Sequence, residues 1–206
     1  MPRPKTRSDE HVLDAALALV HEGGIERLTF AALADRCGLS PATLVQRFGT
    51  KADLTHRALL QAWDQLDALT AELARTVPRS AEGAVAFLLG LSKQYEGMEP
   101  YRSGLLVLHE DLRDPVLRQR GTAWEEALTA ALDECFASTP DAPERIGHAL
   151  ASHWQGALTW WAFHASRPIT EYLADSLNEV IAMLVPSLRP RPDEATTAER
   201  PQPQRT

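Results

Sequence analysis

Helical periodicity along almost the whole chain is the feature that most constrains the fold of this sequence. Apolar residues recur at spacings of three and four from residue 8 to residue 188, whereas alternating β-branched runs and Asn-Gly or Asp-Gly hairpin signals are missing. No segment repeats at a fixed period. The sequence therefore predicts an all-α fold of about nine helices.

Glycine, proline and capping residues divide the chain into helical segments. Three short helices are expected first, and Thr50 is expected to cap a long fourth one. The proline-rich tail, residues 189–206, has no helical period and is expected to be disordered. The predicted helices span residues 8–22, 29–37, 41–48, 51–76, 80–97, 101–112, 115–137, 142–165 and 169–188.

The second and third short helices are separated only by Cys37-Gly38-Leu39. This spacing is typical of a helix-turn-helix, in which the second helix of the pair enters the DNA major groove. That groove is about 12 Å wide and admits one α-helix. Leu44 and Phe48, four residues apart, are expected to face the interior. The outward positions then hold small and polar residues, namely Ala42, Thr43, Gln46 and Arg47.

Residues 28–54 resemble the DNA-binding segment of tetracycline-repressor-type (TetR family) transcriptional regulators. The length of about 200 residues and the helical remainder also fit this family. The sequence departs from the family pattern at Val45, where a Tyr commonly contacts a phosphate, and at Ala42, where Gly is frequent. The matching positions are Thr29, Ala34, Gly38, Ser40, Leu44, Phe48, Lys51 and Leu54.

The resemblance implies a role for each residue of a DNA-binding site. Thr29 and Lys51, at helix N-termini, are expected to hold phosphates with help from Ser40. Base edges are expected to be contacted by Thr43, Gln46 and Arg47, since Gln pairs with adenine and Arg with guanine. The apolar part of the contact is assigned to Pro41, Ala42 and Val45.

The charge of the chain is unevenly distributed. The net charge is −7, yet the first 63 residues carry +1 and the remaining residues carry −8. The first seven residues hold Arg3, Lys5 and Arg7 and no acid. We therefore expect any contact with DNA to be limited to one end of the protein.

The predicted organisation is an arm and helix-turn-helix domain over 1–50, an effector-binding and dimerisation domain over 51–188 that opens with the connecting helix, and the tail.

Several classes of protein are disfavoured by the sequence. It has no GxSxG, HExxH, Walker-type or GxGxxG motif, so we expect neither an enzyme nor a cofactor, and its seven histidines form no metal-binding pattern. Cys37 and Cys135 lie far apart in the sequence, without CxxC spacing. The chain has neither a signal-peptide core nor an apolar run long enough to span a membrane, so a cytoplasmic protein with reduced thiols is expected.

The segment after residue 63 is expected to bind a ligand and to dimerise, because helix-turn-helix regulators bind palindromes as dimers with half-sites about 34–36 Å apart. The alternative is that its aromatic residues form an ordinary core. The expected ligand pocket comprises Trp63, Met98, Tyr101, Leu105, His109, Trp124, Trp154 and Trp161. The expected dimer interface comprises Ile146, Ala149, Gly156, Trp160, Leu177, Val180 and Leu184.

Two functions from different classes fit the sequence. The first is a ligand-responsive, homodimeric transcriptional regulator, a repressor released from a palindromic operator of double-stranded DNA by a small apolar or amphipathic effector. The second is a helical small-molecule-binding protein that shares the fold but does not recognise a DNA sequence. Val45 and the weak positive charge keep the second possibility open.

Overall fold

The periodicity of the sequence correctly predicts the fold class. The computed structural model describes residues 7–95 and 97–189, and within these ranges it contains nine α-helices, three 3-10 turns and no strand. Residues 1–6 and 190–206 lie outside the described ranges, and so do Arg3, Lys5 and nearly all of the tail that we expect to be disordered. The α-helices are α1 (Asp9–Gly23), α2 (Phe30–Cys37), α3 (Pro41–Phe48), α4 (Lys51–Thr76), α5 (Ala81–Ser92), α6 (Met98–Arg113), α7 (Pro115–Cys135), α8 (Ile146–His164) and α9 (Ile169–Leu184).

Side-chain caps fix the starts of the N-terminal helices. The hydroxyl oxygens of Ser8, Thr29 and Ser40 each accept a hydrogen bond from a backbone N–H in the first turn of α1, α2 and α3. Thr50 and Asp53 form a reciprocal capping box at the start of α4, as their spacing predicts. Gly38 ends α2 in the left-handed conformation, with φ of 65°, which a residue with a Cβ adopts only at a cost.

Several helix ends in the C-terminal half differ from those predicted. Helix α8 begins at Ile146 rather than at residue 142, because the chain forms turns before it and Arg145 adopts a positive φ of 60°. Helix α9 ends at Leu184, since Pro186 cannot continue it, and a 3-10 turn takes over residues 186–188. Helix α6 begins three residues early at Met98, and α5 ends at Ser92 before a second 3-10 turn.

The buried apolar residues form two separate clusters, and α4 contributes to both. The N-terminal cluster joins α1, α2 and α3 to the first two turns of α4 through Leu54 and Ala58. The C-terminal cluster joins α5, α7, α8 and α9, and Leu66 and Leu73 of α4 pack against it. Helix α4 is thus a single rod shared by the two cores.

Cys37 and Cys135 are buried in different clusters and are not bonded to each other.

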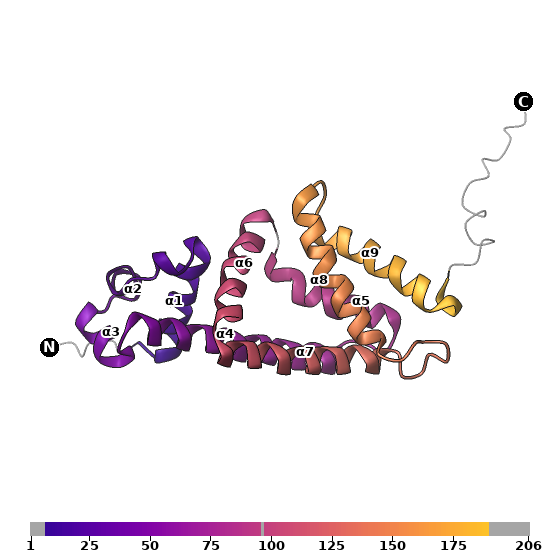
Figure 1. Ribbon diagram of the computed structural model, residues 1–206, viewed down its shortest axis with the longest axis horizontal. Coiled ribbons are helices and arrows are strands. Elements are labelled where there is room, and N and C mark those ends of the chain that lie inside the picture. Colours follow the sequence, from indigo (N-terminus) through magenta and orange to yellow (C-terminus); the bar gives the residue numbers. More distant parts are fainter. Residues whose placement is uncertain (1–6, 96, 190–206) are drawn as a thin grey trace, which may run out of the picture.

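The helices are arranged along one long axis (Figure 1). Helices α1, α2 and α3 form one end, α4 runs beside α7 along one edge, and α6 stands between the N-terminal helices and α5, α8 and α9. Helix α1 packs against both α4 and α6, and α8 packs between α7 and α9. None of the helices within the described ranges is long and apolar enough to cross a membrane.

Candidate nucleic-acid interface and ligand cavity

Helix α3 exposes the side chains that the sequence predicts to face DNA. Leu44 and Phe48 are buried, with exposed fractions of 0% and 3%, and hold the helix against the N-terminal cluster. Pro41, Ala42 and Gln46 are exposed, and Val45 is 48% exposed. The outer face of α3 is therefore a narrow strip of small and amide side chains, of a width that suits a major groove.

Two of the predicted phosphate contacts cap helices of the protein itself. The Ser40 hydroxyl accepts from the Thr43 backbone N–H at 3.1 Å and lies 2.8 Å from the Thr43 hydroxyl. The Thr29 hydroxyl accepts from the Ala32 backbone N–H at 3.1 Å. Both residues remain exposed, so each hydroxyl still has a free lone pair or a proton for a neighbouring phosphate.

Arg47 is held by an ion pair inside the protein. Its guanidinium donates from Nε to Asp9 Oδ1 at 3.0 Å, and its Nη2 contacts the same oxygen. Arg57 of α4 donates to Asp9 Oδ2 at 3.0 Å and to the Arg47 carbonyl oxygen at 3.3 Å. Both guanidinium groups lie over the Phe48 ring. Asp9, Arg47 and Arg57, which we call the clamp, thus join the end of α3 to α1 and α4.

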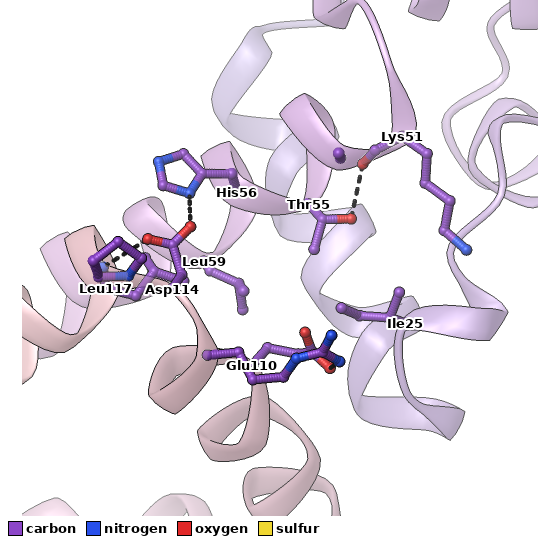
Figure 2. A pocket seen from close by; sticks show the side chains of 11 residues that line it. Ile25, Lys51, Thr55, His56, Leu59, Glu110, Asp114 and Leu117 are labelled. Atoms are coloured by element: carbon purple, nitrogen blue, oxygen red, sulfur yellow. Dashed lines mark hydrogen bonds and ion pairs between the residues drawn. The ribbon is translucent and has the colours of Figure 1, made fainter.

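The start of α4 places a second cation near this face. Figure 2 shows Lys51 among the side chains that line the neighbouring pocket, and its ammonium has no ion-pair partner in the described part of the chain. The Asp53 carboxylate accepts from the Thr50 backbone N–H at 3.0 Å, and the Thr50 contacts lower the pKa of Asp53. The Asp53 carboxylate therefore already accepts a backbone N–H at the start of α4. The Lys51 ammonium is the group there that remains available to bind a phosphate.

A pocket of about 660 Å³ separates the start of α4 from the junction of α6 and α7 (Figure 2). His56 Nδ1 and Asp114 Oδ2 are 2.9 Å apart across it, and Asp114 also caps α7 by accepting from the Val116 N–H at 2.7 Å. These hydrogen bonds lower the pKa of Asp114 despite some desolvation. A polar contact therefore ties the DNA-proximal part of α4 to the junction of α6 and α7.

A larger cavity of about 930 Å³ lies between the two cores. Its wall is built from α1, α4, α6, α7 and α8, together with the end of α5 and the turn that follows it. Leu17 and His21 of α1 belong to this wall, so the cavity directly contacts a helix of the N-terminal cluster. Aromatic rings dominate the lining, namely Trp63, Tyr95, Tyr101, Trp124 and Trp154.

The three indole N–H groups of this lining all donate to oxygen atoms of the protein. Trp124 donates to the Thr70 hydroxyl and Trp154 to the Ser92 hydroxyl, each at 2.8 Å. Trp63 donates to Asp111 Oδ1 at 3.1 Å. Asp111 is only 8% exposed, and its burial raises the pKa of the carboxyl to about 6. The cavity therefore contains a carboxylate held in a largely apolar surrounding.

Residues 12–58 match the model of the bacterial regulatory proteins of the tetR family, a segment that contains α2, α3 and the start of α4. The N-terminal segment of the chain thus resembles the DNA-binding part of the TetR family of transcriptional regulators. None of the curated proteins matches the chain in sequence.

Solved structures share the fold of this chain over most of its length. A transcriptional regulator from Rhodococcus sp. Rha1 is 21% identical, with 88% of this chain and 97% of that one covered at a TM-score of 0.70. The TetR-family regulator PfmR from Thermus thermophilus is 22% identical, with coverages of 84% and 96% and a TM-score of 0.56. A protein from Saccharomonospora viridis, solved in complex with choline, is 19% identical, with coverages of 84% and 94% and a TM-score of 0.66.

The lining of the larger cavity contains five of the eight residues predicted for a ligand pocket: Trp63, Tyr101, Leu105, Trp124 and Trp154. The other three lie outside its lining. Trp161 packs in the C-terminal cluster and donates to the Arg167 carbonyl oxygen, whereas His109 is exposed and Met98 lies at the first position of α6.

Asp111 is the buried charged residue among the lining residues that the sequence analysis did not predict. On a helix that turns about 100° per residue, His109 and Asp111 lie about 80° to either side of Tyr101. Periodicity therefore offers no basis for choosing between them. Asp111 is placed in the wall by the packing of α6 on α1 and α7 and by its hydrogen bond from the Trp63 indole of α4.

The residues predicted for dimerisation differ widely in exposure. Ile146 and Leu177 are 2% and 0% exposed and belong to the core of their own chain. Trp160 is 61% exposed, and its ring centroid lies 5.8 Å from that of Phe163, which is 76% exposed. A Cβ at Gly156 would meet no described atom within 4 Å. The partly buried members are Ala149, Val180 and Leu184.

Proposed function

We propose that this protein is a ligand-responsive, homodimeric DNA-binding regulator of the TetR family that represses by binding a palindromic operator and is released by a small molecule. The observation that carries the proposal is the position of the 930 Å³ cavity, whose wall includes α1 and α4. Both helices also form the N-terminal cluster that supports α3. A ligand in the cavity therefore contacts the same helices that orient the DNA-binding helix.

The physical basis of the proposed response is linkage between two sites. A ligand that prefers one arrangement of α1, α4 and α6 shifts the population towards that arrangement, and the affinity for DNA changes by the same factor as the affinity for the ligand. The contact between His56 and Asp114 offers a second connection between the body and α4. Choline in a protein with this fold is a precedent for a small molecule in such a regulator.

We assign DNA contacts to residues at and around α3. Thr43 and Gln46 are proposed to contact base edges, Val45 a thymine methyl group, and Lys51, Thr29 and Ser40 phosphates. Arg47 would have to leave Asp9 before it could reach a base, so we propose that its main part is to position α3 through the clamp. We also place the boundary of the DNA-binding domain inside α4, after Ala58 rather than after residue 50, because Leu54 and Ala58 pack in its core.

The dimer is proposed to form through the exposed apolar surface of α8 and α9. Trp160 and Phe163 of α8, together with Met183 of α9, are 61%, 76% and 58% exposed. Large apolar side chains that remain in contact with water are typical of residues that a partner covers. Trp160→Ser should lower the apparent mass from dimer to monomer in sedimentation velocity, whereas Leu112→Ser, at a 60% exposed position of α6, should not.

A helical binding protein without sequence-specific DNA recognition is the second candidate. It is favoured by Val45, which stands where the family commonly has Tyr, and by the ion pair that occupies Arg47. In this case α3 would retain its fold, but its exposed face would discriminate weakly between base pairs.

A salt-dependent mobility-shift assay separates the two functions. The full-length protein is titrated into genomic fragments that include the promoter beside its own gene, with Gln46→Ala as the test variant and Gln119→Ala, an exposed position of α7, as the control. We expect specific binding that Gln46→Ala weakens about tenfold or more and that Gln119→Ala leaves unchanged. Equal, weak binding to all fragments would contradict the proposed function and favour the second candidate.

A further inference from the structure

We propose that the cavity takes an organic cation of the tertiary or quaternary ammonium class. The proposal rests on the effector-binding function above and specifies the chemistry of the ligand. With a volume of about 930 Å³, the cavity has the size of a site for a drug-sized molecule. Its two chemical features, aromatic faces and unbalanced negative charge, both favour a cation.

The tryptophans of the lining have no indole N–H group left for a ligand, so they can contact one only through their rings. Trp63, Trp124 and Trp154 form a row, with ring centroids 6.1 Å and 6.5 Å apart, and their indole N–H groups are already donated to the protein. Tyr95 and Tyr101 form a second, edge-to-face pair 5.9 Å apart. The face of an aromatic ring is electron-rich and attracts an alkylammonium group, most strongly where the ring is an indole and water is excluded.

The charged residues of the lining give the cavity a negative field. Among the described residues of its wall there are three carboxylates, of Glu22, Glu99 and Asp111, and no Lys or Arg. Glu22 is paired with Arg36 at 2.7 Å and Glu99 with Arg102 at 2.9 Å, and all four side chains are at least 36% exposed. Asp111 has no such partner, because its described contact is the Trp63 indole N–H.

Asp111 is therefore a buried carboxylate without a positively charged partner among the described residues. A buried carboxylate is costly unless a cation accompanies it. The pKa of about 6 leaves Asp111 largely ionised at pH 7.5. Partial desolvation lowers the pKa of His21, another residue of the lining, so its imidazole adds no positive charge at this pH. A bound ammonium group would supply the missing positive charge, whereas an anionic ligand would be repelled.

Matched probes test the charge preference on the full-length protein without DNA. Phenyltrimethylammonium and tert-butylbenzene differ only in the exchange of a charged nitrogen for carbon, and benzenesulfonate provides an anion. At pH 7.5, titration followed by calorimetry and by tryptophan fluorescence should give a Kd for the cation about tenfold below that of tert-butylbenzene, with no binding of benzenesulfonate. Asp111→Asn should abolish the preference for the cation, and Asp35→Asn, at an exposed position of α2, should retain it.

The outcomes distinguish this proposal from the function on which it rests. Equal affinity for phenyltrimethylammonium and tert-butylbenzene, or an unchanged preference in Asp111→Asn, would overturn the cation proposal and leave an apolar effector site intact. Failure of both probes and of the neutral dye Nile red to bind would overturn the effector site itself. Retention of tert-butylbenzene binding by Asp111→Asn establishes that the variant is folded, so that its loss of cation binding supports the proposal.

Discussion

The N-terminal end of the molecule is tightly connected, whereas the region between the two cores contains a cavity. Around α3 the short helices are capped, and the clamp connects α1, α3 and α4 in one network of charged side chains. Between the cores, by contrast, helices of both ends leave a cavity of about 930 Å³ lined by aromatic rings. The end that carries α3 is thus held in one geometry, whereas the body retains a cavity whose size suits a small-molecule ligand.

Helix α4 connects these two regions. Its first two turns carry Leu54 and Ala58 into the N-terminal core, and its middle carries Trp63 and Leu66 into the cavity wall. A continuous helix transmits a displacement of its middle to its end because its backbone hydrogen bonds resist bending. Substitutions that affect one end and not the other therefore test the proposed mechanism.

Core truncations at either end should destabilise the molecule as one cooperative unit. Leu33→Ala in the N-terminal cluster and Leu150→Ala in the C-terminal cluster each remove a fully buried side chain and should cost about 2–5 kcal/mol. All five tryptophans lie beyond residue 62. Because α4 is shared and α1 packs on α6, Leu33→Ala should shift the urea midpoint by tryptophan fluorescence as well as by circular dichroism.

Leu112→Ala, at a 60% exposed position, is the matched control and should cost less than about 1 kcal/mol. All variants are compared at one protein concentration, since dimerisation adds to apparent stability. Two separate transitions, with only the circular dichroism signal shifted in Leu33→Ala, would show that the ends unfold independently.

Asp111→Asn should stabilise the protein above pH 6. In the folded state the pKa of Asp111 is raised from 3.8 to about 6 by burial, so between these values the folded protein holds a proton that the unfolded chain has released. Stability therefore falls as pH rises through this window, by on the order of 2–3 kcal/mol in total. The amide of Asn still accepts from Trp63 and carries no charge.

The measurement is the difference in unfolding free energy between Asp111→Asn and the parent protein. It should be close to zero near pH 4 and grow to its full value by pH 8. Taking the difference cancels the other carboxylates, since Asp9, Asp53 and Asp114 have lowered pKa values and act at lower pH in both proteins. A difference that does not change with pH would mean that Asp111 is solvated in the folded state.

Sequence patterns predicted the N-terminal end far better than the cavity. Its caps and its glycine turn are local, so Thr29, Ser40, Gly38 and the pair of Thr50 and Asp53 could be placed from spacing alone. The cavity depends on long-range packing between helices, and the hydrogen bond from Trp63 of α4, 48 positions away, accompanies the placement of Asp111 rather than His109 in its wall. The clamp was missed for the same reason, because Asp9 and Arg47 are 38 positions apart.

Val45→Tyr should strengthen DNA binding modestly. At 48% exposure, residue 45 lies at the surface of α3, where a larger ring can extend into solvent. A tyrosine hydroxyl that donates to a phosphate contributes about 1 kcal/mol, or roughly fivefold in Kd. The gain should be equal for specific and random fragments, and the salt dependence should not change, because no charge is added. Weaker binding in the mobility-shift assay would mean that Val45 makes an apolar base contact that tyrosine removes.

The smallest expected effect belongs to the clamp. Asp9 is 51% exposed, so its ion pairs contribute at most about 1 kcal/mol, and Asp9→Asn should lower the affinity for the operator only about twofold to fivefold by loosening α3. Asp35→Asn, at an exposed position of α2, is the matched control. If Arg47 instead recognises a base after leaving Asp9, the substitution releases a competitor and binding becomes tighter. The sign of the change in Kd therefore decides whether Arg47 positions the recognition helix or contacts DNA itself.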